Sequence, residues 1–126
     1  MDKQIKILLV DDDTFLSAIY AEKFESQNFV VSQAINGEEG LKMAKKDMPD
    51  IILLDLLMPK MDGFECLERI KSDKELRDIP VIIHSNLGGR DDIERCMHLG
   101  ASAYLIKSHT LPHEAVNKVK AVLHIE

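Results

Sequence analysis

Short runs of apolar residues recur along the chain, and longer segments with helical periodicity separate them. Several runs are almost continuous in Ile, Leu and Val, which is typical of strands in a sheet that is covered on both faces. A run near residue 30 is less apolar and is therefore expected at an edge of the sheet. We predict strands over residues 5–10, 29–34, 51–54, 81–84 and 102–106.

The segments between these runs carry the signals of amphipathic helices. Asp13 or Thr14 is expected to cap the first helix, and Asn36, followed by an acid three residues later, the second. The third helix is expected after residue 63, the fourth from about residue 91 to a terminating Gly100, and the fifth from about residue 110. The residues expected to face the core are Phe15, Leu16, Ile19, Tyr20 and Phe24 in the first helix, Leu41 and Ala44 in the second, Phe64, Leu67 and Ile70 in the third, and Leu111, Ala115, Val119 and Leu123 in the fifth.

Strand and helix patterns alternate through all 126 residues. This alternation predicts an α/β fold in which right-handed crossovers join the strands of a parallel sheet. The length suits a single domain over residues 1–126, and no second domain is expected after the last helix. The glycine patterns of dinucleotide-binding and P-loop folds do not occur in the chain.

Polar side chains follow four of the predicted strands, at the point where each strand ends. Asp11 and Asp12 follow the first strand, and Asp55 follows the third. Ser85 lies just beyond the fourth, and Lys107 just beyond the fifth. Because the carboxyl ends of parallel strands meet at one edge of a sheet, we expect these side chains to form one site.

The residue types in this cluster suit a divalent cation and a phosphoryl group. Two unit charges about 4 Å apart repel by roughly 4 kcal/mol at an effective dielectric constant of about 20, so three carboxylates need compensation. Mg²⁺ supplies it, because it binds one or two carboxylates, keeps several waters and shares phosphate oxygens. A carboxylate beside Mg²⁺ and Lys107 could accept a phosphoryl group, and Ser85 could donate a hydrogen bond to it.

The chain resembles, nearly end to end, the receiver domain of two-component response regulators. This resemblance implies a flavodoxin-like (βα)5 fold, doubly wound, with strand order 2-1-3-4-5. The motifs that carry it are ILLVDDD (7–13), DIILLDLLMPKMDG (50–63), IPVIIHSNLG (79–88) and GASAYLIK (100–107).

The resemblance also implies a role for each residue of the cluster. Asp55 corresponds to the phosphoacceptor, and Lys107 to the lysine that contacts the phosphoryl group. Ser85 and Tyr104 correspond to the hydroxyl and aromatic switch residues. The implied Mg²⁺ ligands are Asp12 directly, Asp11 mainly through water, Asp55, and the backbone carbonyl of Leu57.

The implied function is a signalling receiver and not an enzyme that acts on other molecules. A sensor histidine kinase or histidine phosphotransfer protein docks near the first helix, and Asp55 takes its phosphoryl group and later hydrolyses it. The face formed by the fourth helix, fifth strand and fifth helix then binds a downstream protein. Whether the chain forms a weak homodimer stays open. A haloacid-dehalogenase-like phosphatase, which would use Asp11 as nucleophile, and a pseudo-receiver scaffold that is never phosphorylated are the alternatives.

Several positions depart from the usual receiver pattern. Ser108 replaces a proline that often follows a cis peptide bond, so we expect a trans bond here. Asn86 replaces a small residue and is expected to narrow access to Asp55. Leu57 and Leu87 stand where polar residues can place the attacking water. We therefore predict a long-lived phosphorylated state.

Charge and hydropathy exclude several other functions. The net charge of −6 argues against direct nucleic-acid binding. No apolar stretch reaches transmembrane length, so no membrane insertion is expected, and the residues Met1 to Gln4 lack the apolar core of a signal peptide. Cys66 and Cys96 are expected to be reduced packing residues. A cytoplasmic protein is predicted.

Overall fold

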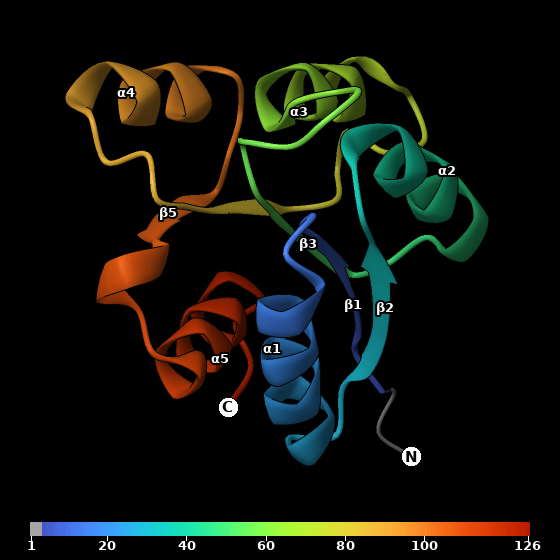
Figure 1. The fold of residues 1–126 in the computed structure, drawn as a ribbon. Coiled ribbons are helices and arrows are strands. Elements are labelled where there is room, and N and C mark those ends of the chain that lie inside the picture. Colours follow the sequence, from blue (N-terminus) through green and yellow to red (C-terminus); the bar gives the residue numbers. More distant parts are fainter. Residues whose placement is uncertain (1–3) are drawn as a thin grey trace.

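The computed structural model describes residues 4–126, and within this range a five-stranded parallel sheet is flanked by helices (Figure 1). The expectation about a signal peptide therefore falls mainly on residues 1–3, which lie outside the described residues. The elements in chain order are β1 (Lys6–Val10), α1 (Thr14–Ser26), β2 (Val30–Ala34), α2 (Gly37–Asp47), β3 (Ile51–Leu54), α3 (Gly63–Ser72), β4 (Val81–Ser85), α4 (Arg90–His98), β5 (Ala103–Ile106), the 3₁₀ helix η1 (Lys107–His109) and α5 (Pro112–Val122).

The strand order is β2-β1-β3-β4-β5, which confirms the predicted flavodoxin-like fold and the edge position of β2. The register aligns the carboxyl ends of the central strands. Val10 pairs with Leu54, so the residues that follow them, Asp11 and Asp55, are neighbours. Ser85 pairs with Ile106, which places the start of η1 beside the end of β4.

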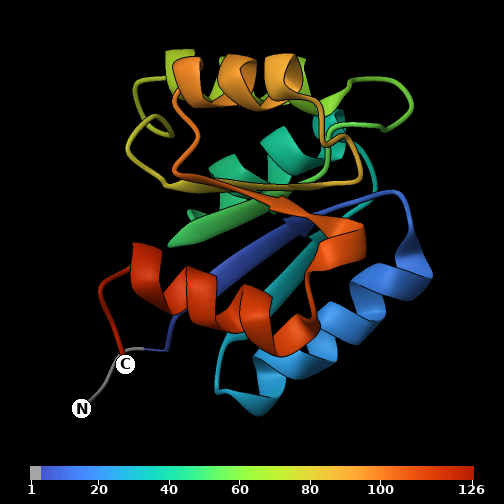
Figure 2. The ribbon, with the colours of Figure 1, turned by 90° about the vertical axis from the view of Figure 1, so that its left-hand side faces the viewer.

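Two helical layers cover the sheet. Helices α1 and α5 lie on one face, and α2, α3 and α4 lie on the other (Figures 1 and 2). The central strands are buried on both sides, since Ile7, Leu9 and Ile82 pack with the α1–α5 layer and Leu8 and Ile83 with the other. This explains the continuous apolar runs of the sequence. The two free cysteines are buried in the layer of α2, α3 and α4, as predicted.

Helix boundaries follow the polar caps that the sequence provides. The side chains of Asp13, Asn36 and Asp62 each accept a hydrogen bond from a backbone N–H in the first turn of α1, α2 and α3. Gly100 follows α4 with a φ of 108°, a conformation that suits glycine. Helix α5 begins at Pro112 and not near residue 110, because residues 107–109 form the 3₁₀ turn.

Three apolar residues expected in the core are exposed. The exposed fractions are 79% for Phe15, 43% for Ile19 and 58% for Leu111. Their packing was predicted wrongly, because the apolar residues of α1 spread over more than one face and Leu111 precedes the first turn of α5. The residues of α1 that are buried are Ser17, Tyr20, Ala21 and Phe24.

Candidate functional site

The carboxyl ends of β1 and β3 bring three carboxyl groups together. One oxygen each from Asp11, Asp12 and Asp55 lies within 4.8 Å of the other two. Asp11 and Asp55 are buried, whereas Asp12 is exposed. The sequence predicted this grouping, because each acid follows a strand and the parallel register aligns the strand ends.

The ammonium group of Lys107 lies between two of these carboxylates. Its Nζ is 2.7 Å from Asp11 Oδ2 and 3.0 Å from Asp55 Oδ2, and only 11% of its side chain is exposed. Burial opposes the charge on Lys107, but its hydrogen bonds to the two carboxylates raise its pKa above the ordinary value. Burial raises the pKa of Asp55, and Lys107 partly offsets this effect.

Neighbouring backbone holds the second oxygen of each buried carboxylate. Asp11 Oδ1 accepts from the N–H of Asp13 at 2.9 Å, and Asp55 Oδ1 accepts from the N–H of Leu56 at 2.8 Å. Each carboxylate is therefore held at one oxygen by its own loop and at the other by Lys107.

This donor set fits a hard divalent cation. Three carboxylates and one ammonium leave two negative charges uncompensated when all are ionised. Carboxylate oxygens are the protein ligands that Mg²⁺ prefers. Leu57 lies in the loop after β3 with its side chain 58% exposed, and the part of its backbone carbonyl as a ligand stays a prediction.

The two predicted switch residues, Ser85 and Tyr104, both bond to the backbone of Leu87. Ser85 is completely buried, and its Oγ accepts from the N–H of Leu87 at 3.2 Å. The hydroxyl of Tyr104 donates to the carbonyl of Leu87, and burial raises the pKa of Tyr104 to about 12. Sequence reasoning missed this anchor, because it uses backbone atoms that every residue has. The Leu87 side chain is half-buried against the core layer of α2, α3 and α4.

The turn after Lys107 has a conformation that the sequence left open. The Lys107–Ser108 peptide bond is trans, as expected. The N–H of Ser108 donates to Asn86 Oδ1 at 3.0 Å, so the Asn86 side chain makes a specific contact with this turn. The hydroxyl of Tyr20 reaches the same loop and donates to the carbonyl of Thr110 at 3.0 Å.

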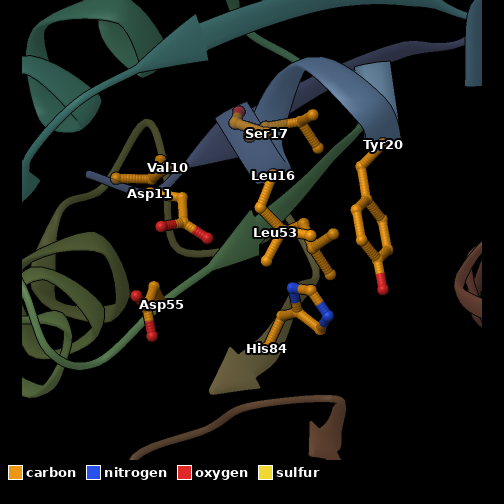
Figure 3. A pocket seen from close by; sticks show the side chains of 9 residues that line it. Val10, Asp11, Leu16, Ser17, Tyr20, Leu53, Asp55 and His84 are labelled. Carbon is orange, nitrogen blue, oxygen red and sulfur yellow. The ribbon is translucent and has the colours of Figure 1, made fainter. Parts of the chain in front are cut away.

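A small cavity lies between the acidic groups and helix α1. Figure 3 shows the carboxylates of Asp11 and Asp55 on one side of it and the rings of His84 and Tyr20 on the other. The two ring centroids are 4.7 Å apart. His84 is buried, and its Nε2 has no hydrogen-bond partner among the described residues. Burial, with a smaller effect of the Lys107 charge, lowers the pKa of His84 to about 4.

Comparison with known proteins gives a consistent set of relatives. The regulator RpaA of Synechocystis, described as a DNA-binding dual master transcriptional regulator, is 36% identical over 118 residues, which cover 94% of this chain and 48% of that protein. The response regulator PleD of Caulobacter vibrioides is 41% identical over 102 residues, 81% of this chain and 22% of PleD. The chain therefore spans less than half the length of these two relatives.

Solved structures share the fold over almost the whole chain. A CheY-like receiver domain protein of Methanospirillum hungatei has a TM-score of 0.90 at 25% identity, covering 97% of this chain and 95% of that one. CheY of Borrelia burgdorferi, in a complex with CheX, BeF₃ and Mg, has a TM-score of 0.87 at 30% identity, covering 94% of this chain and 89% of that one.

No helix within residues 4–126 is both long and apolar enough to cross a membrane.

A family model, the response regulator receiver domain, matches residues 7–119. This match favours the receiver over the haloacid-dehalogenase-like alternative. The sheet order, the acidic edge and the match over residues 7–119 together lead to one conclusion: the chain belongs to the response regulator receiver domain family.

Proposed function

We propose that this receiver takes a phosphoryl group onto Asp55 from a phosphohistidine of a sensor histidine kinase or histidine phosphotransfer protein, in the presence of Mg²⁺. The observation that carries the proposal is the position of Lys107, whose ammonium contacts the carboxylates of both Asp11 and Asp55. A buried carboxylate in contact with a fixed cation is suited to accept a group that brings negative charge.

The transfer exchanges one bond to phosphorus for another. An oxygen of Asp55 forms a bond to phosphorus while the bond from phosphorus to the histidine nitrogen breaks, and the imidazole leaves with the electron pair. Lys107 keeps its contact with Asp11 and can turn its remaining N–H groups to the phosphoryl oxygens. Bound Mg²⁺ would neutralise phosphoryl charge at the carboxylates of Asp11, Asp12 and Asp55. Later hydrolysis returns Asp55, so the chain acts only on its own carboxylate.

The contacts of Leu87 suggest how the switch works. Ser85 Oγ is the acceptor in its bond with the N–H of Leu87, so its own O–H can be donated to a phosphoryl oxygen. A turn of the Ser85 side chain toward that oxygen would lengthen or break the bond to Leu87. Tyr104 is bound to the carbonyl of the same residue, so a shift of this loop would also release its hydroxyl. The surface of α4, β5 and α5 would then change, and we propose that a downstream protein, or weakly a second copy of the chain, binds there.

The exposed apolar residues Phe15, Ile19 and Leu111 support a docking surface for the phosphodonor. Phe15 and Ile19 lie in α1, whose first residue comes just after the acidic loop, and Leu111 precedes α5 in the loop that follows Lys107. A phosphohistidine presented over this surface could reach Asp55. We expect Phe15→Ala to slow transfer from a protein donor that phosphorylates the wild type, but to leave transfer from acetyl phosphate unchanged.

The proposal is tested by incubation with acetyl phosphate and Mg²⁺, followed by intact-protein mass spectrometry. The wild type is expected to gain the mass of one phosphoryl group, and EDTA should abolish the gain. Asp55→Asn should gain nothing. Asp62→Asn is the matched control, because it changes an acid in the same loop and keeps the N-cap acceptor of α3.

Two other results would support the alternatives. Failure of the wild type to gain a phosphoryl group from acetyl phosphate would favour a pseudo-receiver scaffold. Turnover of a phosphate monoester that is lost in Asp11→Asn and kept in Asp55→Asn would favour a phosphatase.

We further propose that residues 1–126 form a single receiver domain and that the protein is cytoplasmic.

A further inference from the structure

A hydrogen bond joins the loop after β4 to the turn after β5. Asn86 Oδ1 accepts from the backbone N–H of Ser108 at 3.0 Å. Asn86 directly follows Ser85, and Ser108 directly follows Lys107. The bond therefore lies one residue beyond two groups of the acidic site.

This bond completes the support of the Lys107 backbone. On the amino-terminal side of Lys107, Ile106 pairs with Ser85 in the sheet. On its carboxyl-terminal side, Ser108 is bound by Asn86. Both neighbours of Lys107 are thus held by consecutive residues of the β4 segment, and the side chain of Asn86 provides the second contact.

Two departures from the receiver pattern are partners in this contact. A proline at position 108 would have no N–H to donate, and a small apolar residue at position 86 would have no acceptor. Serine at 108 supplies the donor, and asparagine at 86 supplies the acceptor. The expectation that Asn86 narrows access to Asp55 does not account for this bond.

We propose that Asn86 is a positioning residue that holds Lys107 against Asp11 and Asp55 through the N–H of residue 108. The inference rests on the proposed phosphorylation of Asp55, because it assigns Asn86 a role in the rate of that reaction. Asn86 touches none of the reacting groups through this bond, and its effect is carried by the backbone of the turn. The net contribution of a single hydrogen bond changes an equilibrium constant or a rate by about three- to tenfold.

Two substitutions separate positioning from access. Asn86→Leu keeps a side chain of similar size and branching but removes the acceptor, and Asn86→Ala removes both the bulk and the acceptor. Ser108→Ala is the matched control, because it removes the hydroxyl and keeps the N–H. Residues 86 and 108 are both exposed, so all three variants are expected to fold.

The first measurement is the initial rate of phosphoryl gain from acetyl phosphate at saturating Mg²⁺. We expect Asn86→Leu and Asn86→Ala to be slower by about three- to tenfold and Ser108→Ala to match the wild type. The Mg²⁺ dissociation constant should stay unchanged, because the carboxylates are intact. A faster Asn86→Ala with an unimpaired Asn86→Leu would overturn the proposal and assign Asn86 to access. Equal rates in all variants would also overturn it and leave the proposed function standing.

The second measurement requires no phosphorylation and decides the case in which the wild type takes up no phosphoryl group. Amide hydrogen exchange of residue 108 and ¹⁵N relaxation of the Lys107 ammonium are measured by NMR in the wild type and the variants. Exchange about fivefold faster, together with a more mobile ammonium, is expected in Asn86→Leu and Asn86→Ala. Unchanged exchange and mobility in both variants would refute the positioning role.

Discussion

At the ends of β1 and β3, a backbone N–H one or two residues away holds one oxygen of each buried carboxylate. Around β4 and β5, Ser85 also bonds locally, to Leu87, but three other side chains bond to distant parts of the chain. These three are the side chains of Lys107, Asn86 and Tyr104.

Burial sets β5 apart from the strands beside it. Every residue of β3 and β4 is buried, whereas every residue of β5 is only half-buried. We infer that the β1–β3 side, with fixed acids, provides the place of reaction, and that β5 and the loops after β4 and β5 provide the part that moves. Loops held by a few long-range contacts are the segments that open most readily.

The largest effect on stability is expected at Gly63 in the loop after β3, where an added side chain would collide with backbone atoms. A Cβ atom at position 63 would lie 2.0 Å from the Asp55 carbonyl oxygen and 2.6 Å from Leu56 Cα. Gly63→Ala should therefore lower the free energy of unfolding by about 3 kcal/mol, as measured by urea denaturation. At position 89 on the β4 side, the nearest atom to an added Cβ is Asp92 Oδ2 at 3.5 Å, so Gly89→Ala should cost no more than about 1 kcal/mol. Equal costs for the two would contradict the distinction.

A slightly smaller loss of stability is expected when Lys107, which contacts the acids of the β1–β3 side, is replaced. Lys107→Met leaves the buried carboxylates of Asp11 and Asp55 without their cation, and it should cost about 2 to 3 kcal/mol at pH 7. Its effect should also depend on pH. Without Lys107 the pKa of Asp55 rises further, so the folded variant binds a proton at Asp55 more readily than the unfolded variant does. The loss of stability relative to the wild type should therefore become smaller from pH 7 to pH 5. Lys118→Met is the control, because Lys118 is an exposed residue of α5. A loss of stability that does not depend on pH would argue against this explanation.

The next effect concerns His84 at the cavity. Its pKa is about 4 in the folded protein and near 6.5 when unfolded, so the unfolded state takes up a proton first as the pH falls. This group should therefore remove about 2 kcal/mol of stability between pH 7 and pH 5. His84→Gln should lose less stability than the wild type over this range in paired denaturation curves. Parallel curves would show that His84 is not the group responsible.

The smallest effect on stability is expected in the loops that flank the site. Leu57 is exposed after β3, so Leu57→Asn should change stability by no more than about 0.5 kcal/mol. If its polar group places the attacking water, phosphate loss after removal of the donor should be about fivefold faster. Leu87→Glu is expected to speed phosphate loss too, but it should also cost about 1 to 2 kcal/mol because Leu87 packs on the core. Unchanged lifetimes in both would refute the predicted long-lived phosphorylated state.

The sequence was sufficient to predict the acidic edge, because that edge depends on strand ends. Asp11, Asp55, Ser85 and Lys107 each follow an apolar run, and a parallel sheet leaves little freedom in where such residues meet. The caps at Asp13 and Asn36 were predictable for a similar reason, since their partners are three residues away.

Contacts that depend on the conformation of two loops could not be predicted. The bond from Ser108 to Asn86 joins a backbone group to a side chain 22 residues away, and both Ser85 and Tyr104 bond to backbone atoms of Leu87. The exposure of Phe15 was also missed, because apolar residues on two faces of α1 look like one broad stripe in the sequence.

The bond between residues 86 and 108 has a consequence for protein engineering. A chimaera that exchanges the segment after β4 without the segment after β5 would separate the Asn86 acceptor from the N–H of residue 108. In a receiver with proline at position 108, the asparagine would face a residue that has no N–H to donate. A chimaera that contains these segments should keep the phosphorylation rate of this chain only when residues 86 and 108 are transferred together.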